Sequence, residues 1–330
     1  MKRIIFSLLI LGFTILGFST IKIGAVLPVT GAISAFGQLV WEGVQLAYEQ
    51  IPEVLGEEVQ LVLVDNRSEK TEAANAVARA IDKEHVVAII GEVASSHSLA
   101  GGQIAEDKKV PMVSPSSTNP MVTQGKKFVS RVCYTDPFQG GALAVFAHDM
   151  LGLKKVAVFV DFEQDYSVGL SNFFIDNFTK LGGKVKKIFY KSGDQEFSAQ
   201  ITQALSYGAD AILVTGYYPE IALVAQQAKM LGFNGKILAG DGADAPELIQ
   251  IGGEAVEGIY FTTHFHPDAK VTNKSKEFVD LFVKKYGRKP STLAALGYDA
   301  YMIVVNAIKR AGKIDPELIA QEIRKTVNFE

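Results

Sequence analysis

Short apolar runs rich in β-branched residues alternate along this chain with segments of helical spacing. The first such runs are Ile21 to Leu27, Val59 to Val64, Val86 to Ile90 and Val110 to Val113. The segment between the first two carries one helical stripe of apolar residues, Val40, Val44, Ala47, Tyr48 and Ile51. Strands joined by helical crossovers run parallel, and a parallel sheet needs helices over both faces. The alternation therefore predicts an α/β fold.

The same alternation recurs in the second half of the chain. Its strand-like runs are Lys155 to Val160, Val185 to Phe189, Ala211 to Val214 and Lys236 to Leu238. Two helical stripes lie between them, Leu170, Phe174, Phe178 and Leu181, and then Ile221, Val224, Ala228 and Leu231. With 330 residues, 48% of them hydrophobic, the chain is too long for a single simple hydrophobic core. We expect two doubly wound parallel-sheet lobes.

After a further strand-like run, Ile259 to Thr263, the pattern changes to three long helical segments, Asn273 to Tyr286, Leu293 to Ala311 and Pro316 to Lys325. The middle segment is apolar almost all round and needs cover on several sides, which packing onto one of the sheets supplies. The chain would then cross between the lobes at Arg131 to Asp136 and at Thr262 to His266, and adjacent crossings form a multi-strand hinge. We expect one lobe from 20–134 with 264–330 and the other from 135–263.

The N-terminus has the layout of a secretory signal peptide. Lys2 and Arg3 precede an uncharged apolar stretch, and small residues at Gly17 and Ser19 suit cleavage after Ser19. The alternative is a membrane anchor, but polar and small residues dilute the run. The only cysteine, Cys133, is far from this cut, which excludes lipid attachment there. We expect residues 1–19 to be removed and the mature protein to be periplasmic and not lipid-anchored.

Composition and motifs exclude several functions. Without Lys2 and Arg3 the chain has 31 basic and 36 acidic residues, a net charge of −5, and no basic block that would bind nucleic acid. The nucleotide-binding patterns G-x-x-x-x-G-K-[ST] and G-x-G-x-x-G after a strand are absent, as is the hydrolase turn G-x-S-x-G. His264 and His266 could begin a metal site, but no motif completes it. We expect no enzyme activity, no cofactor and no metal.

Hydroxyl-bearing loops follow two neighbouring strands of the first lobe. One contains Ser95, Ser96 and Ser98, and the other is Ser114-Pro115-Ser116-Ser117-Thr118-Asn119-Pro120. Such serines often only cap helices. Two such loops side by side, with their free backbone amides and a helix dipole, form a small anion site that suits a carboxylate. The corresponding strand ends of the second lobe carry Asp161 with Tyr166, Tyr217 with Tyr218, and Asp241. Ligands of doubly wound sheets bind at these carboxyl ends.

The order and spacing of several strings resemble one family, the type I periplasmic solute-binding proteins of the branched-chain amino acid (Leu/Ile/Val-binding) class, which serve ABC importers. The strings extend from Leu27-Pro28-Val29-Thr30-Gly31 to Gly297-Tyr298-Asp299-Ala300. Between them lie Phe36-Gly37-Gln38, Ser95-Ser96, Ser114 to Pro120, Tyr134 to Gly140, Asp161 to Tyr166, Phe197 to Ile201 and Gly216 to Glu220.

The resemblance implies a role for each candidate site residue. The hydroxyls at Ser95 and Thr118, with nearby amides, would hold a ligand α-carboxylate. The carbonyl of Ser116, the carboxylate of Asp241 and the phenol of Tyr217 would hold the α-ammonium. The side-chain pocket would be lined by Phe36, Tyr166 and Ala94. The full set of expected ligand-binding residues is Phe36, Ala94, Ser95, Ser116, Ser117, Thr118, Tyr166, Tyr217 and Asp241.

Two features depart from the family pattern. The family often has glutamate where this chain has Asp241, so the carboxylate reaches about one methylene less and the ligand must sit closer to the second lobe or use a bridging water. The family also continues beyond the equivalent of Glu330 with strands that close the second lobe. We expect these closing strands to be missing here.

The resemblance implies the substrate-binding component of an ABC importer for amino acids, most simply Leu, Ile or Val, with an aromatic side chain as the next choice. The ligand would be held in the cleft by hinge closure. Its partners would be the free amino acid and the membrane permease subunits, and we expect a monomer. Three alternatives stay open: an amide or urea receptor, an exported sensor domain of the same fold, and a hydrolase.

Overall fold

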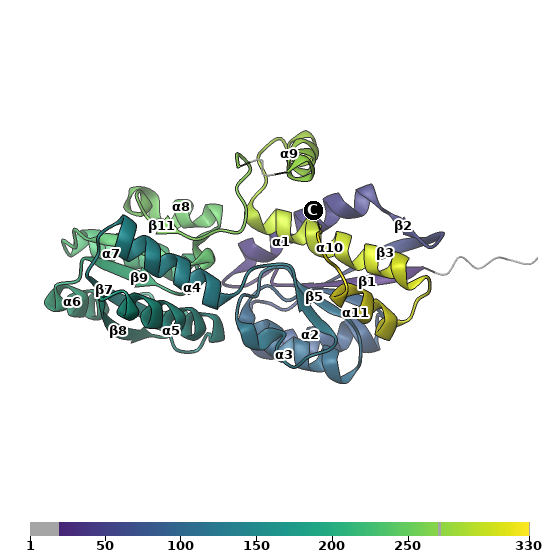
Figure 1. Cartoon of the computed structure of the whole chain (residues 1–330), viewed down its shortest axis with the longest axis horizontal. Coiled ribbons are helices and arrows are strands. Elements are labelled where there is room, and N and C mark those ends of the chain that lie inside the picture. Colours follow the sequence, from purple (N-terminus) through teal and green to yellow (C-terminus); the bar gives the residue numbers. More distant parts are fainter. Residues whose placement is uncertain (1–19, 270–271, 330) are drawn as a thin grey trace, which may run out of the picture.

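Two parallel sheets lie side by side in the computed structural model, which describes residues 20–269 and 272–329 (Figure 1). The predicted signal peptide, 1–19, lies outside the described residues. The first sheet has the order β2-β3-β1-β4-β5-β6 and is parallel except for the pair β2–β3. Its strands are β1 (Ile21–Leu27), β2 (Glu53–Val54), β3 (Glu57–Asp65), β4 (Ala88–Gly91), β5 (Met112–Ser114) and β6 (Val129–Arg131).

The second sheet repeats this plan with the order β11-β10-β9-β7-β8, all parallel. Its strands are β7 (Lys155–Asp161), β8 (Lys184–Tyr190), β9 (Ala211–Val214), β10 (Lys236–Ala239) and β11 (Tyr260–Phe261). In each sheet the first long strand lies between the next two along the chain: β1 lies between β3 and β4, and β7 lies between β8 and β9. The loops after the first and third strands therefore leave toward opposite faces, which opens a crevice at the carboxyl ends.

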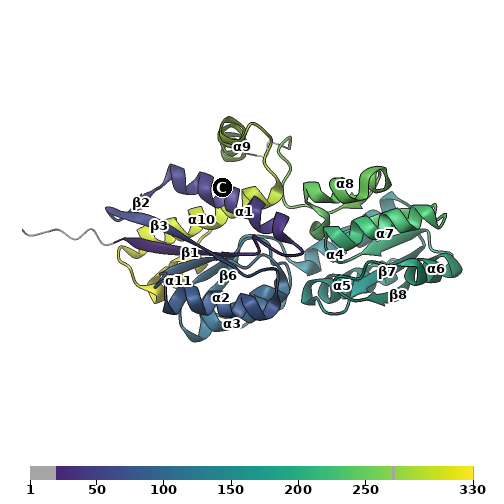
Figure 2. The ribbon, with the colours of Figure 1, turned by 180° about the vertical axis from the view of Figure 1, so that it is seen from behind.

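Helices cover both faces of each sheet (Figures 1 and 2). We call the first sheet and its helices the first lobe; these helices are α1 (Ser34–Gln50), α2 (Lys70–Asp82), α3 (Ser95–Asp107), α9 (Asn273–Tyr286), α10 (Thr292–Ala311) and α11 (Pro316–Arg324). The second lobe contains the second sheet with α4 (Asp136–Val145), α5 (Asp165–Lys180), α6 (Ser198–Tyr207), α7 (Tyr218–Met230) and α8 (Pro246–Gly252). The predicted α/β fold with two parallel-sheet lobes is confirmed; the exact lobe limits stay a prediction.

Some elements differ from those expected. Strands β2 and β6 and helix α4 were not predicted, and only Tyr260–Phe261 of the strand-like run after Ile259 forms β11. Strands β2, β6 and β11 lie at sheet edges. They form because they pair with a neighbouring strand, and not because their own residues alternate. After β11 the described residues form helices only. Within the described part of the chain, no helix combines the length and apolar character needed to cross a bilayer.

The close packing of helix α1 against helix α10 fixes where these two helices begin in the first lobe. The backbones approach closely because Gly43 of α1 lies against the carbonyl of Ala294, and Gly297 of α10 lies against the carbonyl of Val40. The buried Tyr301 hydroxyl donates to the carbonyl of Ile51 at 2.7 Å, which ties α10 to the end of α1. Both helices begin at the edge of the first lobe that faces the second.

A buried carboxyl group, Glu92, lies directly after β4 beneath the serine loops. Its side chain accepts a hydrogen bond from Asn66 Nδ2, and burial raises the pKa of Glu92 to about 8, despite a smaller lowering by that bond. The backbone carbonyl of Glu92 accepts from the hydroxyls of Ser98 at 3.1 Å and Ser114 at 2.7 Å. The loop after β4 is thereby held against the loop after β5.

Gly43→Ala should destabilise the folded chain. The added Cβ would overlap the carbonyl oxygen of Ala294, so the two helices must separate. Overpacking of this kind costs about 1–3 kcal/mol, measured as the free energy of unfolding in denaturant without ligand. Gly141→Ala in α4 is the control, because its Cβ would have no neighbour nearer than 4.0 Å. Equal losses in both variants would contradict the close approach of α1 and α10.

Stability should decline with rising pH because of Glu92. The folded chain keeps the Glu92 proton up to about pH 8, whereas the unfolded chain releases it near 4.5. The contribution of Glu92 to the free energy of unfolding therefore falls as the pH rises between these values. Glu92→Gln should make that decline shallower in urea titrations at several pH values. Glu254→Gln, with a side chain that is 93% exposed, should follow the wild type. A wild-type slope in Glu92→Gln would refute this account.

Candidate functional site

A small cavity lies between the lobes, at the carboxyl ends of both sheets. It measures about 20 Å³ with the lobes in this arrangement, so an amino acid fits between the lobes only when they part slightly. The first lobe contributes Phe36, Val93, Ser95, Ser116 and Leu293, and the second lobe contributes Tyr166, Tyr217, Asp241 and Gly242. These residues come from the loops and helix starts after β1, β4, β5, β7, β9 and β10, and from the start of α10. The cavity thus occupies the crevice that the strand order opens in each sheet.

The first-lobe side of the cavity is a helix N-terminus with two serine hydroxyls. Ser95 is the first residue of α3, and no side chain caps this helix. The Ser95 hydroxyl accepts from the Asn119 amide at 3.2 Å, and the Ser116 hydroxyl donates to the Val93 carbonyl at 3.0 Å. The first amides of a helix and its dipole attract negative charge. This side of the cavity therefore suits a carboxylate.

Asp241 provides the negative charge on the second-lobe side. Its side chain is 11% exposed. One carboxylate oxygen, Oδ1, accepts from the Tyr166 hydroxyl at 2.8 Å, and the other, Oδ2, lies 3.0 Å from His264 Nε2. The Asp241 amide donates to Gln139 Oε1 at 2.8 Å, which fixes the backbone of this loop. A carboxylate held in this way can accept a further bond from a cation in the cavity.

A second acid, Asp136, is fully buried near Asp241. Burial and the charge of Asp241 raise the pKa of Asp136 to about 7, although the neighbouring Thr118 hydroxyl, the Gln139 amide and the charge of Arg131 lower it. Since Asp136 begins α4, it lies at the point where the chain enters the second lobe. The second-lobe side of the cavity therefore becomes more negative as the pH rises through neutrality.

Three aromatic rings form the wall between these two ends. Tyr166 and Tyr217 stack at 5.4 Å between ring centroids, and Phe36 meets Tyr217 edge-on at 5.8 Å. Burial raises the pKa of both tyrosines well above the usual range, so both phenols stay neutral donors. The Tyr217 hydroxyl is buried and has no hydrogen-bond partner in the described structure. The wall combines apolar surface with one donor that is available to a ligand.

The two lobes touch around the cavity. Asp165, the first residue of α5, donates its amide to Ser96 Oγ at 2.8 Å and accepts from Asn119 Nδ2 at its carbonyl at 2.8 Å. Its carboxylate pairs with Lys70 at 3.1 Å. Elsewhere on the rim, the Tyr218 hydroxyl donates to the carbonyl of Ala32 at 3.1 Å. The lobes are thus in a closed arrangement, and a solute can enter only when they part.

Six of the nine expected site residues line the cavity: Phe36, Ser95, Ser116, Tyr166, Tyr217 and Asp241. The other three lie beside it. Ala94 immediately precedes α3, and the Ser117 hydroxyl is bonded inside the first lobe to the carbonyls of Glu92 and Val93. Thr118 is buried, and its carbonyl accepts from the Asp136 amide at 2.9 Å.

Sequence reasoning missed Val93, Gly242 and Leu293, which also line the cavity. Val93 and Gly242 adjoin residues that were singled out, so loop position could have found them. Leu293 had no local signal. His264, considered above as a metal ligand, instead contacts Asp241. The described residues contain no group of three His, Cys, Asp or Glu side chains placed to hold a metal ion.

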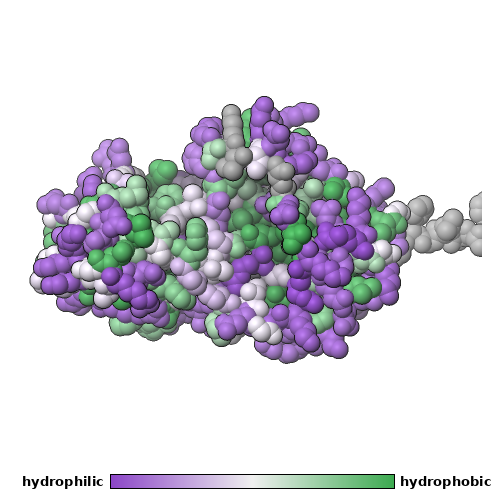
Figure 3. Space-filling view, in the orientation of Figure 1, coloured by the Kyte–Doolittle hydropathy of each residue, from purple (hydrophilic) through white to green (hydrophobic). Residues whose placement is uncertain are grey.

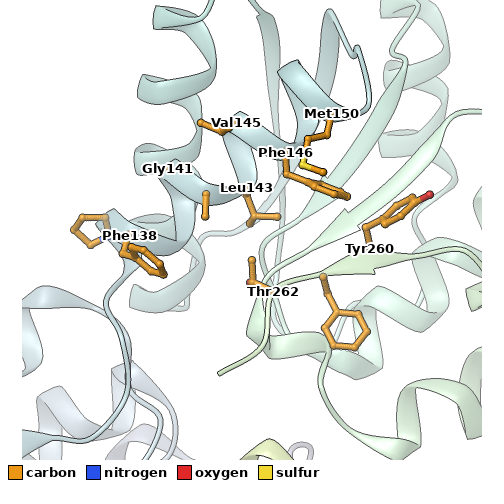
Figure 4. Close-up of a pocket in the computed structure, with 11 residues that line it drawn as sticks. Phe138, Gly141, Leu143, Val145, Phe146, Met150, Tyr260 and Thr262 are labelled. Atoms are coloured by element: carbon orange, nitrogen blue, oxygen red, sulfur yellow. The ribbon is translucent and has the colours of Figure 1, made fainter. Parts of the chain in front are cut away.

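A larger hollow lies on the second lobe, and it shares no lining residue with the small cavity. This α4–β11 groove has a volume of about 740 Å³, and its side chains from α4, the helical turn 146–150 and β11 face one another (Figure 4). Its lining is apolar apart from Thr262 and the phenol of Tyr260 and has no charged side chain. The α4–β11 groove therefore lacks the paired charges that a zwitterion needs. A separate apolar area is visible in the middle of the molecule, beneath α9 (Figure 3).

Comparisons with known proteins agree with this geometry. A family model described as periplasmic binding protein matches residues 20–330. The leucine-binding protein LivK of Thermotoga maritima is 68% identical, with a TM-score of 0.93 over 94% of this chain and 88% of that chain. LivJ of Streptococcus pneumoniae, solved with isoleucine, is 32% identical, with a TM-score of 0.88 over 94% and 90%.

A relative found by sequence comparison points to the same family. The leucine-, isoleucine-, valine-, threonine- and alanine-binding protein of Pseudomonas aeruginosa is 30% identical over 335 aligned positions, which cover 98% of this chain and 88% of that protein. The family resemblance seen in the sequence strings is thereby confirmed. With a matching family model over nearly its whole length, the chain belongs to the periplasmic binding protein family.

Proposed function

We propose that this chain is the substrate-binding component of an ABC importer for branched-chain amino acids, leucine, isoleucine or valine. One observation carries the proposal: a single interlobe cavity sets an uncapped helix N-terminus with hydroxyls against the carboxylate of Asp241. A free amino acid has a carboxylate and an ammonium on one carbon, so a site that excludes water must supply partners for both. A relative named as leucine-binding and another solved with isoleucine support this choice of ligand.

In this proposal the ligand α-carboxylate binds the hydroxyls of Ser95 and Thr118 and the amides at the start of α3. Its α-ammonium binds Asp241, the Tyr217 hydroxyl and the carbonyl of Ser116. The unpartnered, buried Tyr217 hydroxyl supports this assignment, because such a group is costly unless a ligand satisfies it. The bonds that Ser117 makes inside the first lobe favour a supporting role for its hydroxyl.

The ligand side chain would lie against Phe36, Tyr166 and Ala94. These residues offer apolar surface and no buried charge to an aliphatic chain, while the polar ends fix its orientation. An aromatic amino acid is the next candidate by the same chemistry. A receptor for amides or urea would have no ammonium for Asp241, which makes that function a weaker fit to the site.

Binding would be coupled to hinge closure. The contacts of Asp165 with Ser96, Asn119 and Lys70 are available only when the lobes meet, and a ligand that touches both lobes favours this closed form. No reaction is needed: the chain binds, closes and releases. We further propose that it acts as a periplasmic monomer without a lipid anchor and delivers the ligand to membrane permease subunits.

Leucine, isoleucine and valine should raise the unfolding temperature of the purified protein. A ligand at 100 times its dissociation constant stabilises the folded form by about 2.7 kcal/mol. All twenty amino acids, urea and acetamide would be compared by thermal unfolding at one concentration. Stabilisation by urea or acetamide, with none by any amino acid, would show that the site does not hold a zwitterion.

Asp241→Asn should weaken leucine binding strongly, since it keeps size and removes the charge facing the ammonium. Loss of one partner of a buried charge pair typically costs about 2–5 kcal/mol, which is roughly 30- to several-thousand-fold in affinity. Affinity would be measured by calorimetry, with Asp244→Asn, in the same loop but outside the cavity lining, as the matched control. Binding within about threefold of wild type would mean that the ammonium is held elsewhere.

The folded state of the Asp241→Asn variant must be checked separately. Asp241 has two side-chain partners, Tyr166 and His264, even without ligand. The Asp241 carboxylate is therefore not free before a ligand arrives, and its replacement can affect the fold as well as binding. The unfolding free energy without ligand should therefore be measured beside the affinity.

A further inference from the structure

His264 joins the proposed ammonium site to both crossings between the lobes. It lies on the second crossing, after β11, and its ring stacks on Tyr134 of the first crossing at 3.7 Å between centroids and 28° between planes. Its side chain is only 5% exposed. Nε2 lies 3.0 Å from Asp241 Oδ2, and the buried Nδ1 has no hydrogen-bond partner in the described structure. The imidazole is therefore a neighbour of Asp241 that solvent barely reaches.

The other charged and titratable groups around this ring are mostly acidic. Asp244, three residues after Asp241, interacts electrostatically with His264 and accepts from the Thr263 hydroxyl. Asp136, at the start of α4, and the thiol of Cys133 interact with Asp241. The permanent cation nearby is Arg131, whose guanidinium is bonded to the carbonyls of Ser117 and Pro120. His266, on the same segment as His264, is exposed and interacts with Asp244.

We propose that His264 is a positioning residue that sets how much negative charge Asp241 presents to a ligand ammonium. A neutral imidazole donates its Nε2 proton in a hydrogen bond and leaves the carboxylate charged. A protonated imidazole forms an ion pair with Asp241, and the ammonium then meets a carboxylate that is already neutralised. The inference rests on the proposed function, because it requires a ligand with an ammonium at Asp241.

The direction of the pH effect follows from like-charge repulsion. An ammonium beside an imidazolium favours loss of the imidazolium proton, so amino acid binding should release a proton. Affinity should then fall as the pH decreases, by at most tenfold for each pH unit for one linked proton. Asp136, whose pKa is raised to about 7, would add a proton release of the same sign.

Calorimetry of L-leucine binding separates the two sources of protons. Titrations in buffers of different ionisation enthalpy give the number of protons released, at several values between about pH 5.5 and pH 8. The wild type should release a substantial fraction of one proton and lose affinity in acid. His264→Gln, which keeps a donor toward Asp241, should release fewer protons and lose less affinity in acid. His266→Gln, the matched control from the same segment, should behave as the wild type.

The possible results distinguish this inference from the proposed function. Equal proton release by wild type and His264→Gln, or none by the wild type, would overturn the role of His264 alone. Absence of binding by every amino acid would overturn the proposed function and this inference with it. If His264→Gln does not fold, the imidazole carbon-bound protons of the wild type can be followed by NMR. Leucine should shift the His264 titration to lower pH, and no shift or an upward shift would refute the proposal.

Discussion

The strand order shared by the two sheets is the constraint on which the cavity depends. Because the first strand of each sheet lies between the second and the third, the loops that leave β1, β4, β7 and β9 open a crevice in each lobe. The two crevices face each other, so the N-termini of α1, α3, α5 and α7 gather around one small space. An anion-attracting helix start and a carboxylate are then brought together by topology, although Ser95 and Asp241 are far apart in sequence.

Most hydroxyls of the serine-rich loops serve the fold rather than the cavity. The hydroxyls of Ser98, Ser114 and Ser117 donate to the Glu92 carbonyl after β4. Those of Ser98 and Ser117 also bond to each other, and the Ser96 hydroxyl accepts from the second lobe. Ser95 and Ser116 alone among these line the cavity. A dense hydroxyl network in a buried loop is rigid when all of its groups are paired. The loops can therefore hold Ser95 and Ser116 in fixed positions at the cavity.

The sequence predicted those strands and helices whose own residues show a periodic apolar pattern. Strand β1 and helix α9 have the bounds expected from their apolar runs, Ile21–Leu27 and Asn273–Tyr286. Strand β6 was not predicted because its single apolar residue, Val129, gives no alternation, and pairing with β5 creates the strand. Six expected site residues line the cavity. Strand ends located from periodicity indicate five of them, and Phe36 was expected only from the family resemblance. Leu293 and the contact of His264 with Asp241 arise from packing between distant segments, which no local pattern reports.

The central claim is that a zwitterion lies between α3 and Asp241, and a crystal structure of the complex with L-leucine tests it most directly. The account predicts leucine in the interlobe cavity, with its carboxylate within about 3.2 Å of the Ser95 hydroxyl and its ammonium within the same distance of Asp241. Leucine bound in the α4–β11 groove, or with its carboxylate toward Asp241, would contradict the account.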